Sequence, residues 1–285
     1  MTSPLVSVYI PTKNRNHLVV EAIDSILQQT FRDIEIIVVD DGSIDDTAAT
    51  LSRVQHEDKR VRVLRNQTSF GPSTARNQAI EAAAGVYVTG LDDDDLMLPN
   101  RIKELLDAKS PKNSLVCTGF LVEKNGKRKS LHNSNREISE NDILHYNFVG
   151  NQALMLKAHV TAIGGFDPEM TASEDYDLWT RLIHRFGNAK RIRGATYVKR
   201  EPSELPRLTR SPNFLLGAKR YTEKHRPRMN TAHLKSQKLI HIISAQKHVP
   251  LRAVPSVFAI KTLPILTKYI LSTTFNDSST HDTRN

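Results

Sequence analysis

The first 95 residues alternate between short apolar runs and stretches with a helical spacing of apolar residues. Residues 5–10, 34–39, 61–64 and 86–89 are rich enough in β-branched and apolar side chains to form buried strands. Strands that alternate with helices indicate right-handed βαβ units and a parallel sheet. The alternation therefore predicts an α/β fold with a mostly parallel, Rossmann-like sheet and helices on both of its faces.

Polar or acidic side chains follow three of these strands. Thr12 follows the first, Asp40 and Asp41 follow the second, and four consecutive aspartates at residues 92–95 follow the last. Ligands of open parallel sheets bind beyond the carboxyl ends of the strands. Adjacent carboxylates repel one another, and hard divalent cations take oxygen ligands, so we expect Mg²⁺ or Mn²⁺ at the aspartates. Taken alone, the aspartates also fit a solvated acidic turn; the strand before them favours the cation site.

Local patterns predict several further elements. An Asn-Gly pair between residues 115–122 and 128–131 marks a tight hairpin, so we expect an antiparallel excursion on the sheet. Residues 153–156 and 192–198 predict two more strands. Ser43, followed three residues later by Asp46, has the form of a capping box that opens the second helix.

Residues 174–186 predict an amphipathic helix with an apolar stripe of Leu178, Trp179, Leu182, Ile183 and Phe186. Asp175 falls on the same inward face, whereas Asp177, Arg181 and His184 are expected to be solvated. Burial raises the pKa of such an inward carboxyl and the helix dipole lowers it. We interpret Asp175 as a general base; a charge that only complements the helix dipole is the alternative.

The net charge of +9 comes from the C-terminal part of the chain. Residues 1–198 carry 24 Lys and Arg against 26 Asp and Glu, whereas residues 199–285 carry 16 against five. This asymmetry suggests an anionic partner for the tail, either a lipid surface or a polyanionic acceptor.

The tail is predicted to be helical at residues 213–247. Residues 251–275 are apolar but interrupted, and are expected either in a membrane interface or packed on the catalytic domain. The last ten residues are expected to be disordered.

Several classes of protein do not fit the sequence. The single cysteine, Cys117, lies in an apolar run, which excludes a disulfide framework and favours a reducing compartment and a core role. We expect neither a signal peptide nor a membrane-spanning helix, because a charged-then-apolar leader and an apolar run of about 18 residues are both missing. The expected location is cytoplasmic, with peripheral attachment to the inner face of the cell membrane.

Five segments resemble, in order, the motifs of family 2 glycosyltransferases with the GT-A fold. They are residues 6–15, 37–47, 75–77, 91–95 with Pro99, and 164–167 with Glu174 and Asp175. Each motif alone is weak, but the ordered set is specific. The resemblance implies a GT-A catalytic domain at 1–200, with a nucleotide-sugar half at about 1–100 and an acceptor half at about 101–200. A basic, mainly helical extension follows at 201–285.

The resemblance also implies an activity. Such enzymes transfer a sugar from a nucleotide-diphosphate donor, commonly UDP-linked, to an acceptor hydroxyl with inversion at the anomeric carbon. Bacterial members often build lipopolysaccharide, O-antigen or capsule, so we expect a glycan or lipid-linked acceptor and no nucleic acid.

The resemblance assigns roles to individual residues. The residues expected to contact the nucleotide sugar are Pro11, Thr12, Arg15, Asp40 or Asp41, Arg76, Asp92 and Asp93. Asp92 and Asp94 form the pair expected to hold Mn²⁺ or Mg²⁺, with the register within 92–95 left open. Asp175 is the expected base, with Glu174 beside it, and Trp179 and Asn151 are expected to face the acceptor.

Two motifs of relatives are missing. Residues 197–201 contain no histidine that could serve as a third metal ligand, and the Gln-x-x-Arg-Trp segment of processive synthases is absent, which favours single-sugar transfer. A nucleotidyltransferase is the first alternative, but residues 11–15 lack the glycine-rich phosphate loop expected of it. A non-catalytic binding module for glycans or nucleic acids is the second. It would explain the basic tail but not the acidic strand ends, which repel phosphate backbones.

Overall fold

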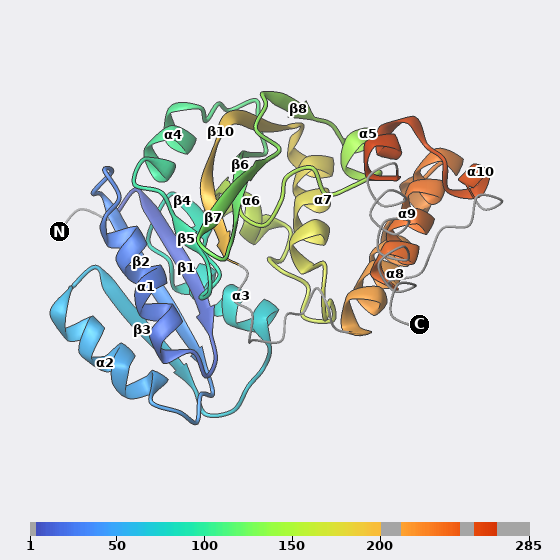
Figure 1. Ribbon diagram of the computed structural model, residues 1–285. Helices are drawn as coiled ribbons and strands as arrows, with labels where there is room; N and C mark the ends of the chain where they lie inside the picture. The colour runs from blue at the N-terminus through green and yellow to red at the C-terminus, as the bar shows by residue number, and fades with distance from the viewer. Residues whose placement is uncertain (1–3, 201–211, 246–253, 267–285) are drawn as a thin grey trace, which may run out of the picture. The chain divides into compact units, whose positions relative to one another are not determined.

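The computed structural model describes residues 4–200, 212–245 and 254–266, which form a mixed α/β sheet structure and a helical C-terminal part (Figure 1). Of the predicted apolar stretch at 251–275, residues 254–266 are described. The remainder of that stretch and the predicted disordered end lie outside the described residues.

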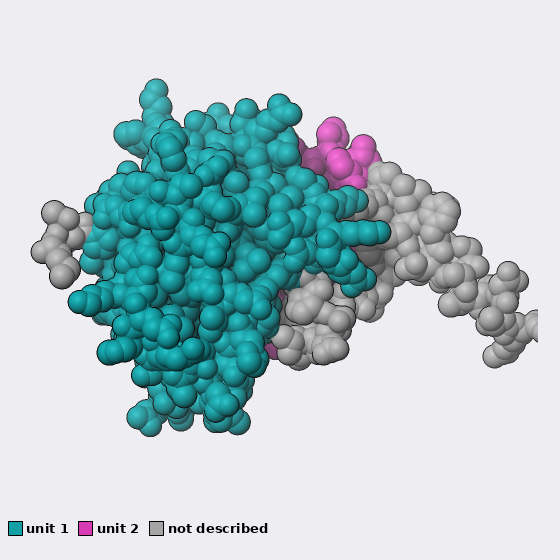
Figure 2. All heavy atoms as spheres, turned by 60° about the vertical axis from the view of Figure 1, so that its left-hand side comes forward, with its two compact units in different colours: residues 1–140, 148–169, 174–204 teal, residues 141–147, 170–173, 205–285 magenta. Residues whose placement is uncertain are grey.

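The chain divides into two compact units, coloured separately in Figure 2. The first unit comprises residues 1–140, 148–169 and 174–204, and the second comprises residues 141–147, 170–173 and 205–285. Two short segments from the first 200 residues therefore belong to the C-terminal unit, which a single boundary at residue 200 does not anticipate.

A single mixed sheet organises the first unit. Its strands lie in the order β3–β2–β1–β4–β9–β6–β10–β5, with β7 paired to β6 and β8 paired to β10. The strands are β1 Val6–Thr12, β2 Ile34–Asp41, β3 Val61–Asn66, β4 Tyr87–Gly90, β5 Leu96–Met97, β6 Leu115–Lys124, β7 Lys127–Leu131, β8 Arg136–Ile138, β9 Leu154–Leu156 and β10 Ala189–Arg200.

The first four strands in the chain are parallel, as predicted. β1 pairs with β2 and β4, and β2 pairs with β3. The register sets Thr12 opposite Asp40, and Tyr9 opposite Gly90 at the end of β4. The polar residues at and after the ends of these strands therefore meet at one edge of the sheet.

The antiparallel excursion is also present. β6 and β7 form the predicted hairpin, with Asn125 and Gly126 at positive φ in its turn. β9 runs antiparallel to both β4 and β6. The short strand β5, which no local pattern predicted, pairs with Tyr197 and Val198 of β10. This pairing brings β10 next to the chain segment that follows the four aspartates.

Helices cover the sheet. Those of the first unit are α1 Asn16–Leu27, α2 Thr47–Glu57, α3 Pro72–Ala82, α4 Arg101–Asp107, α6 Lys157–Ala162 and α7 Glu174–Phe186, and α5 Glu140–Ile143 continues into the second unit. The capping box predicted at Ser43 and Asp46 is wrong, because α2 begins at Thr47 without a side-chain cap. Ser43 instead serves the loop: its N–H donates to Asp40 Oδ1, and its Oγ accepts from Asn14 N.

The core lies on both faces of the sheet. Val6, Val8 and Ile10 of β1 belong to one buried cluster with the inward residues of α1. The alternating residue Tyr9 is also buried, and α3 packs against β1 and β2. Cys117 is fully buried in β6, and burial raises its pKa to about 12, as expected of a core residue.

The second unit is helical. Its helices are α8 Pro212–His225, η2 Arg226–Arg228, α9 Thr231–Ser244, α10 Val254–Val257 and η4 Ile260–Thr262. Val257 and Leu266 pack with Leu239 of α9, so this part of the apolar stretch has its own small core. Phe258, Ile260 and Leu263 of the same stretch are exposed. Within the described residues, the helices lack the combined length and apolar character that crossing a bilayer requires.

Candidate active site

The four aspartates form a tight turn beyond the end of β4, here called the acidic turn (residues 92–95). The N–H of Leu91 donates to Tyr9 O at 3.0 Å, and the N–H of Asp95 donates back to Asp92 O at 3.0 Å. Each of the four carboxylates has a different set of partners, so the fold separates roles that the sequence left open.

Asp95 holds the turn in place. It is buried, and its carboxylate accepts from Tyr197 Oη at 2.7 Å and from the backbone N–H of Arg200 at 2.9 Å. Burial and the neighbouring Asp92 and Asp94 charges raise its pKa well above the usual value. A side chain enclosed in this way supports the turn and does not face a ligand.

Asp93 and Asp94 share one cation. Arg15 Nη1 lies 3.0 Å from Asp93 Oδ1 and 2.8 Å from Asp94 Oδ2. Thr12 Oγ1 donates to the other oxygen of Asp93 at 2.7 Å. Burial raises the pKa of Asp93 to about 6, although Arg15 and Thr12 favour its ionised form.

Asp92 accepts hydrogen bonds from Arg76 of α3 and from Gln152. Its Oδ1 accepts from Arg76 Nη2 at 3.1 Å and from Gln152 Nε2 at 3.2 Å. Gln152 in turn accepts a hydrogen bond from Tyr9 Oη at 3.0 Å. Residue 90 must be glycine here, since a Cβ would lie 2.2 Å from Gln152 Oε1 and 2.3 Å from the Tyr9 ring.

Arg76 connects the acidic turn to α7. Its Nη1 donates to Glu174 Oε1 at 2.7 Å while its Nη2 contacts Asp92. Burial alone would lower the pKa of Arg76, but Glu174 and Asp92 outweigh that effect and raise it, so the guanidinium stays charged. The first turn of α7 therefore adjoins the acidic turn.

Asp175 lies next to this ion-pair network. Burial and the negative charge of Glu174 raise its pKa to about 7, while Arg76 acts in the opposite direction. Its Oδ1 accepts from the backbone N–H of Tyr176 at 2.6 Å. A carboxyl that titrates near neutral pH is suited to accept a proton in a reaction at that pH.

Asp40 and Asp41 differ in what their carboxylates contact. Asp41 accepts four hydrogen bonds from the end of β3 and the loop after it, donated by Asn66 Nδ2, Ser69 Oγ, Phe70 N and Gly71 N. Asp40 is also fully buried, but its Oδ2 has no hydrogen-bond partner and has Arg65 Nε only at 3.5 Å. Of the two, only Asp40 has a carboxylate oxygen without a hydrogen-bond partner among the described residues.

Two side chains of α7 lie deeper than expected. Trp179 is fully buried and its indole N–H donates to Gly150 O at 2.9 Å, so in this structure it packs in the core. The expectation that Asp177 is solvated is wrong: it is fully buried, and Arg181 pairs with it at 2.8 Å. Asn151 is half-buried, and Pro11 lies within β1.

Sequence reasoning missed three polar side chains of the site, namely Gln152, Tyr197 and Arg200. Arg200 donates through Nε to Asp94 O at 2.7 Å and also pairs with Glu21. A tyrosine and an arginine at the end of the last predicted strand were the available signal for the latter two. The position of Gln152 depends on the pairing of β9 with β4, which the sequence did not indicate.

Carboxylate oxygens are the ligands that hard divalent cations prefer, and Asp92 and Asp94 both already lie against a cationic side chain. The chemistry of these two residues therefore fits a divalent cation. In the described part of the chain, no three His, Cys, Asp or Glu side chains form a ready metal cluster.

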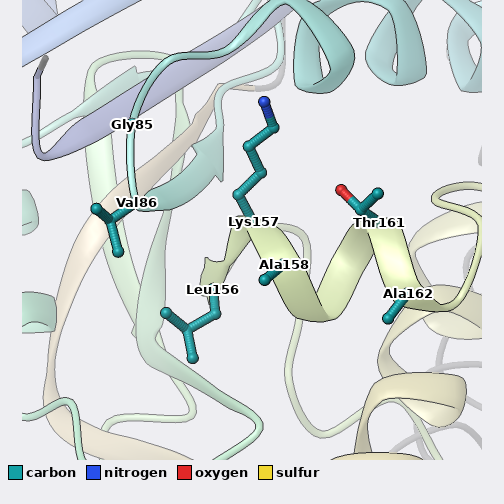
Figure 3. A pocket seen from close by; sticks show the side chains of 7 residues that line it. All are labelled: Gly85, Val86, Leu156, Lys157, Ala158, Thr161 and Ala162. Carbon is teal, nitrogen blue, oxygen red and sulfur yellow. The ribbon is translucent and has the colours of Figure 1, made fainter.

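A pocket of the first unit lies elsewhere. It is lined by Gly85, Val86, Leu156, Lys157, Ala158, Thr161 and Ala162 (Figure 3). Val86 precedes β4, whereas the acidic turn follows it, so the two features are at opposite ends of that strand. The Lys157 ammonium donates to Glu81 O and Ala83 O at the end of α3. These contacts give this lysine a structural role.

Comparison with known proteins identifies a family. Residues 7–167 match the family model described as Glycosyl transferase family 2. The chain is 30% identical over 243 residues to WcaA of Escherichia coli K12, a glycosyl transferase provisionally assigned to colanic acid biosynthesis, covering 82% of this chain and 86% of that protein. It is 35% identical over 186 residues to the GalNAc(5)-diNAcBac-PP-undecaprenol β-1,3-glucosyltransferase of Campylobacter jejuni, covering 63% of this chain and 60% of that one.

Solved structures share the fold. Staphylococcus aureus TarS 1–349 in complex with UDP-GlcNAc has a TM-score of 0.64 at 18% identity, covering 93% of this chain and 81% of that chain. The mannosyltransferase PcManGT of Pyrobaculum calidifontis, in complex with GDP-Man and Mn²⁺, has a TM-score of 0.56 at 19% identity, covering 99% and 77%. Both similarities concern the fold alone.

Proposed function

The chain belongs to glycosyl transferase family 2, and we propose that it moves a sugar from a nucleotide-diphosphate donor to an acceptor hydroxyl with inversion at the anomeric carbon. The observation that carries the proposal is the Arg76 bridge. It brings Asp175, whose pKa is raised to about 7, next to the acidic turn. A proton acceptor and a diphosphate-binding edge are thereby combined in one unit.

Asp175 acts as the general base. An alcohol is a poor nucleophile, so a carboxylate must take its proton as the bond to the anomeric carbon forms. Glu174 is held by Arg76 and keeps the pKa of its neighbour high, which makes Glu174 a positioning residue. Inversion follows from a single displacement, in which the acceptor attacks opposite the leaving diphosphate and no covalent enzyme intermediate forms.

Asp94 and Asp92 are proposed to hold Mn²⁺ or Mg²⁺. When bound, the cation would supply positive charge to the leaving diphosphate. Arg15 and Arg76 approach the same carboxylates and are proposed to contact the diphosphate. Thr12 orients Asp93 in this arrangement.

Asp40 is proposed to contact the nucleoside, because one of its buried oxygens lacks a hydrogen-bond partner. Asp41 is assigned a structural role, because N–H groups of the loop after β3 already bind its carboxylate. The donor is proposed to be UDP-linked; the UDP-GlcNAc complex of TarS supports that choice, and the GDP-Man complex of PcManGT makes GDP the control nucleotide.

The acceptor is proposed to be a lipid-linked or polysaccharide glycan. The names of the E. coli and C. jejuni relatives support this class. The basic balance of residues 199–285 and the exposed Phe258, Ile260 and Leu263 support peripheral contact with an anionic membrane on the cytoplasmic side.

Calorimetric titration with UDP tests the central claim. The wild-type protein is expected to bind UDP about tenfold more tightly or better with Mn²⁺ than without, equivalent to ~1.4 kcal/mol. Asp94→Asn is expected to lose that gain. Asp107→Asn is the matched control, since Asp107 is an exposed aspartate paired with Lys103 on α4. Equal UDP affinity with and without Mn²⁺ in the wild type would refute the metal-assisted donor site.

A panel of UDP- and GDP-sugars then identifies the donor. Hydrolysis or transfer is followed by NMR, which also reports the anomeric configuration of the product. A product with retained configuration would contradict the single displacement.

A further inference from the structure

Arg15 occupies a position that a divalent cation would also require. Its Nη1 is the only nitrogen that the structure records, among the described residues, against both Asp93 Oδ1 (3.0 Å) and Asp94 Oδ2 (2.8 Å). A charged donor between two adjacent carboxylates cancels much of their repulsion. In the protein alone, Arg15 is therefore the counter-ion of this part of the acidic turn.

The backbone of Arg15 is fixed while its side chain reaches outward. Its N–H donates to Thr47 Oγ1 at 3.1 Å, and the residue directly precedes α1. Its side chain is 25% exposed, whereas that of Arg76 is 10% exposed and is held by Glu174 as well as Asp92. Each arginine contacts two carboxylates, but Arg76 is also packed over the Phe166 ring, so Arg15 is the more exposed and less enclosed of the two.

Asp93 does not depend on Arg15 alone. Thr12 Oγ1 donates to its second oxygen at 2.7 Å. If the Arg15 guanidinium moves away, Asp93 keeps a partner, whereas Asp94 becomes available to another cation.

We propose that Arg15 competes with the divalent cation for Asp94 in the free protein and exchanges Asp94 for the donor's diphosphate when the nucleotide binds. The inference rests on the proposed function and adds a coupling mechanism to it. A diphosphate offers the planar guanidinium a bidentate anionic partner, which water does not. Cation and nucleotide therefore bind cooperatively, and the coupling factor is the same in both directions.

The test measures Mn²⁺ binding to the full chain by the EPR signal of free Mn²⁺, with and without saturating UDP. Wild-type protein is expected to bind Mn²⁺ weakly alone and more tightly with UDP. Arg15→Gln removes the competing charge, so Mn²⁺ affinity without UDP should rise by about three- to tenfold, within the usual range of coupling effects. The ratio of Mn²⁺ affinities with and without UDP should fall by a similar factor, and UDP affinity should fall.

Two further variants sharpen the comparison. Arg15→Lys keeps the positive charge, so its Mn²⁺ affinity without UDP is expected to stay closer to the wild-type value. Arg60→Gln removes an arginine of similar exposure, 31%, from a 2.7 Å ion pair with Asp58 before β3. It is expected to change neither Mn²⁺ affinity nor the coupling ratio. If Arg15→Gln does not fold, Arg15→Met carries the same comparison.

The test distinguishes failure of this inference from failure of the proposed function. If Mn²⁺ binds with UDP but Arg15→Gln leaves Mn²⁺ affinity in the absence of UDP unchanged or weaker, Arg15 does not compete and the inference is overturned while the proposed function stands. If Mn²⁺ binds neither protein even with UDP, the metal part of the proposed function fails and the inference fails with it.

Discussion

Arg76 and Glu174, separated by 98 positions in the chain, are joined by a 2.7 Å hydrogen bond between a buried guanidinium and a carboxylate. The bond ties α3 to the first turn of α7. Because Arg76 also contacts Asp92, it fixes how near Asp175 comes to the acidic turn. The same contact sets the electrostatic environment of Asp175, which makes the pair testable by pH.

Asp175→Asn is expected to bind UDP normally and to lower kcat by about 10²–10⁴-fold, the usual contribution of a positioned base. In the wild type, kcat/KM should rise with pH and level off above about pH 7, because Asp175 must be ionised to accept a proton. Initial rates between pH 5.5 and 8.5 check this. A variant with near-native turnover would remove Asp175 as the base.

The raised pKa of Asp175 also has a consequence for stability. A group whose pKa is higher in the folded state stabilises the fold at low pH, and that contribution is lost as the pH rises through about 7. The Asn variant lacks this titration. Its melting temperature relative to wild type should therefore be higher at pH 8.5 than at pH 6.

Replacing Arg76 by Gln should move the acid limb of the pH–rate profile to higher pH. Arg76 lowers the pKa of Asp175, so its removal raises that pKa. The change also leaves Glu174 and Asp92 without their shared cation, which should cost about 3–5 kcal/mol of folding stability. The Arg76→Lys variant keeps the charge and serves as the control; an unshifted limb in Arg76→Gln would contradict the electrostatic link.

Elements with strong local periodicity could be predicted from the sequence. The bounds of α7, Glu174–Phe186, match the predicted range, and β1 and β2 end on the polar residues Thr12 and Asp41. The family resemblance is confirmed by the match over residues 7–167. These features depend on neighbours within a few positions, so the sequence carries them directly.

The roles of adjacent acids could not be predicted, because distant residues decide them. Asp41 is bound by the N–H of Phe70, 29 positions away, and Asp95 by Tyr197, 102 positions away. Asp177 was expected in solvent but is buried. Arg181 neutralises it and also donates to the backbone oxygens of Ile163 and Gly165. Such long-range partners leave no periodic trace in the sequence.

Asp40→Asn and Asp41→Asn are expected to have different effects. Asp40→Asn should lower UDP affinity by about tenfold, or ~1.4 kcal/mol, with little change in melting temperature. Asp41→Asn should instead reduce folding stability by about 1.5–3 kcal/mol, because an amide cannot accept all the bonds that the loop donates. Calorimetry with UDP and denaturant unfolding separate the two outcomes. Equal losses of UDP affinity would contradict the assignment.

Lowering the pH should reduce the contribution of Asp41 to folding stability. Burial raises the pKa of Asp41, but the hydrogen bonds from Phe70 N, Ser69 and Asn66 outweigh it and leave the pKa below the usual value. A lowered folded-state pKa adds stability above the unfolded pKa, and this is lost as the pH falls through the folded value. Wild type and Asp41→Asn should therefore converge in stability at low pH.

Trp179→Ala should reduce folding stability by about 3–5 kcal/mol, the usual cost of removing a buried tryptophan. The side chain is fully buried, and its N–H satisfies Gly150 O, so the loss comes from a cavity and an unpaired carbonyl. The acceptor KM of the milder Trp179→Phe variant, assayed well below its melting temperature, should stay within about twofold of wild type, a difference of ~0.4 kcal/mol. Asn151→Ala is the comparison, since Asn151 is half-buried and remains a predicted acceptor contact. If Trp179→Phe raised the acceptor KM without lowering stability, the indole would have to reach the acceptor in a conformation other than this one.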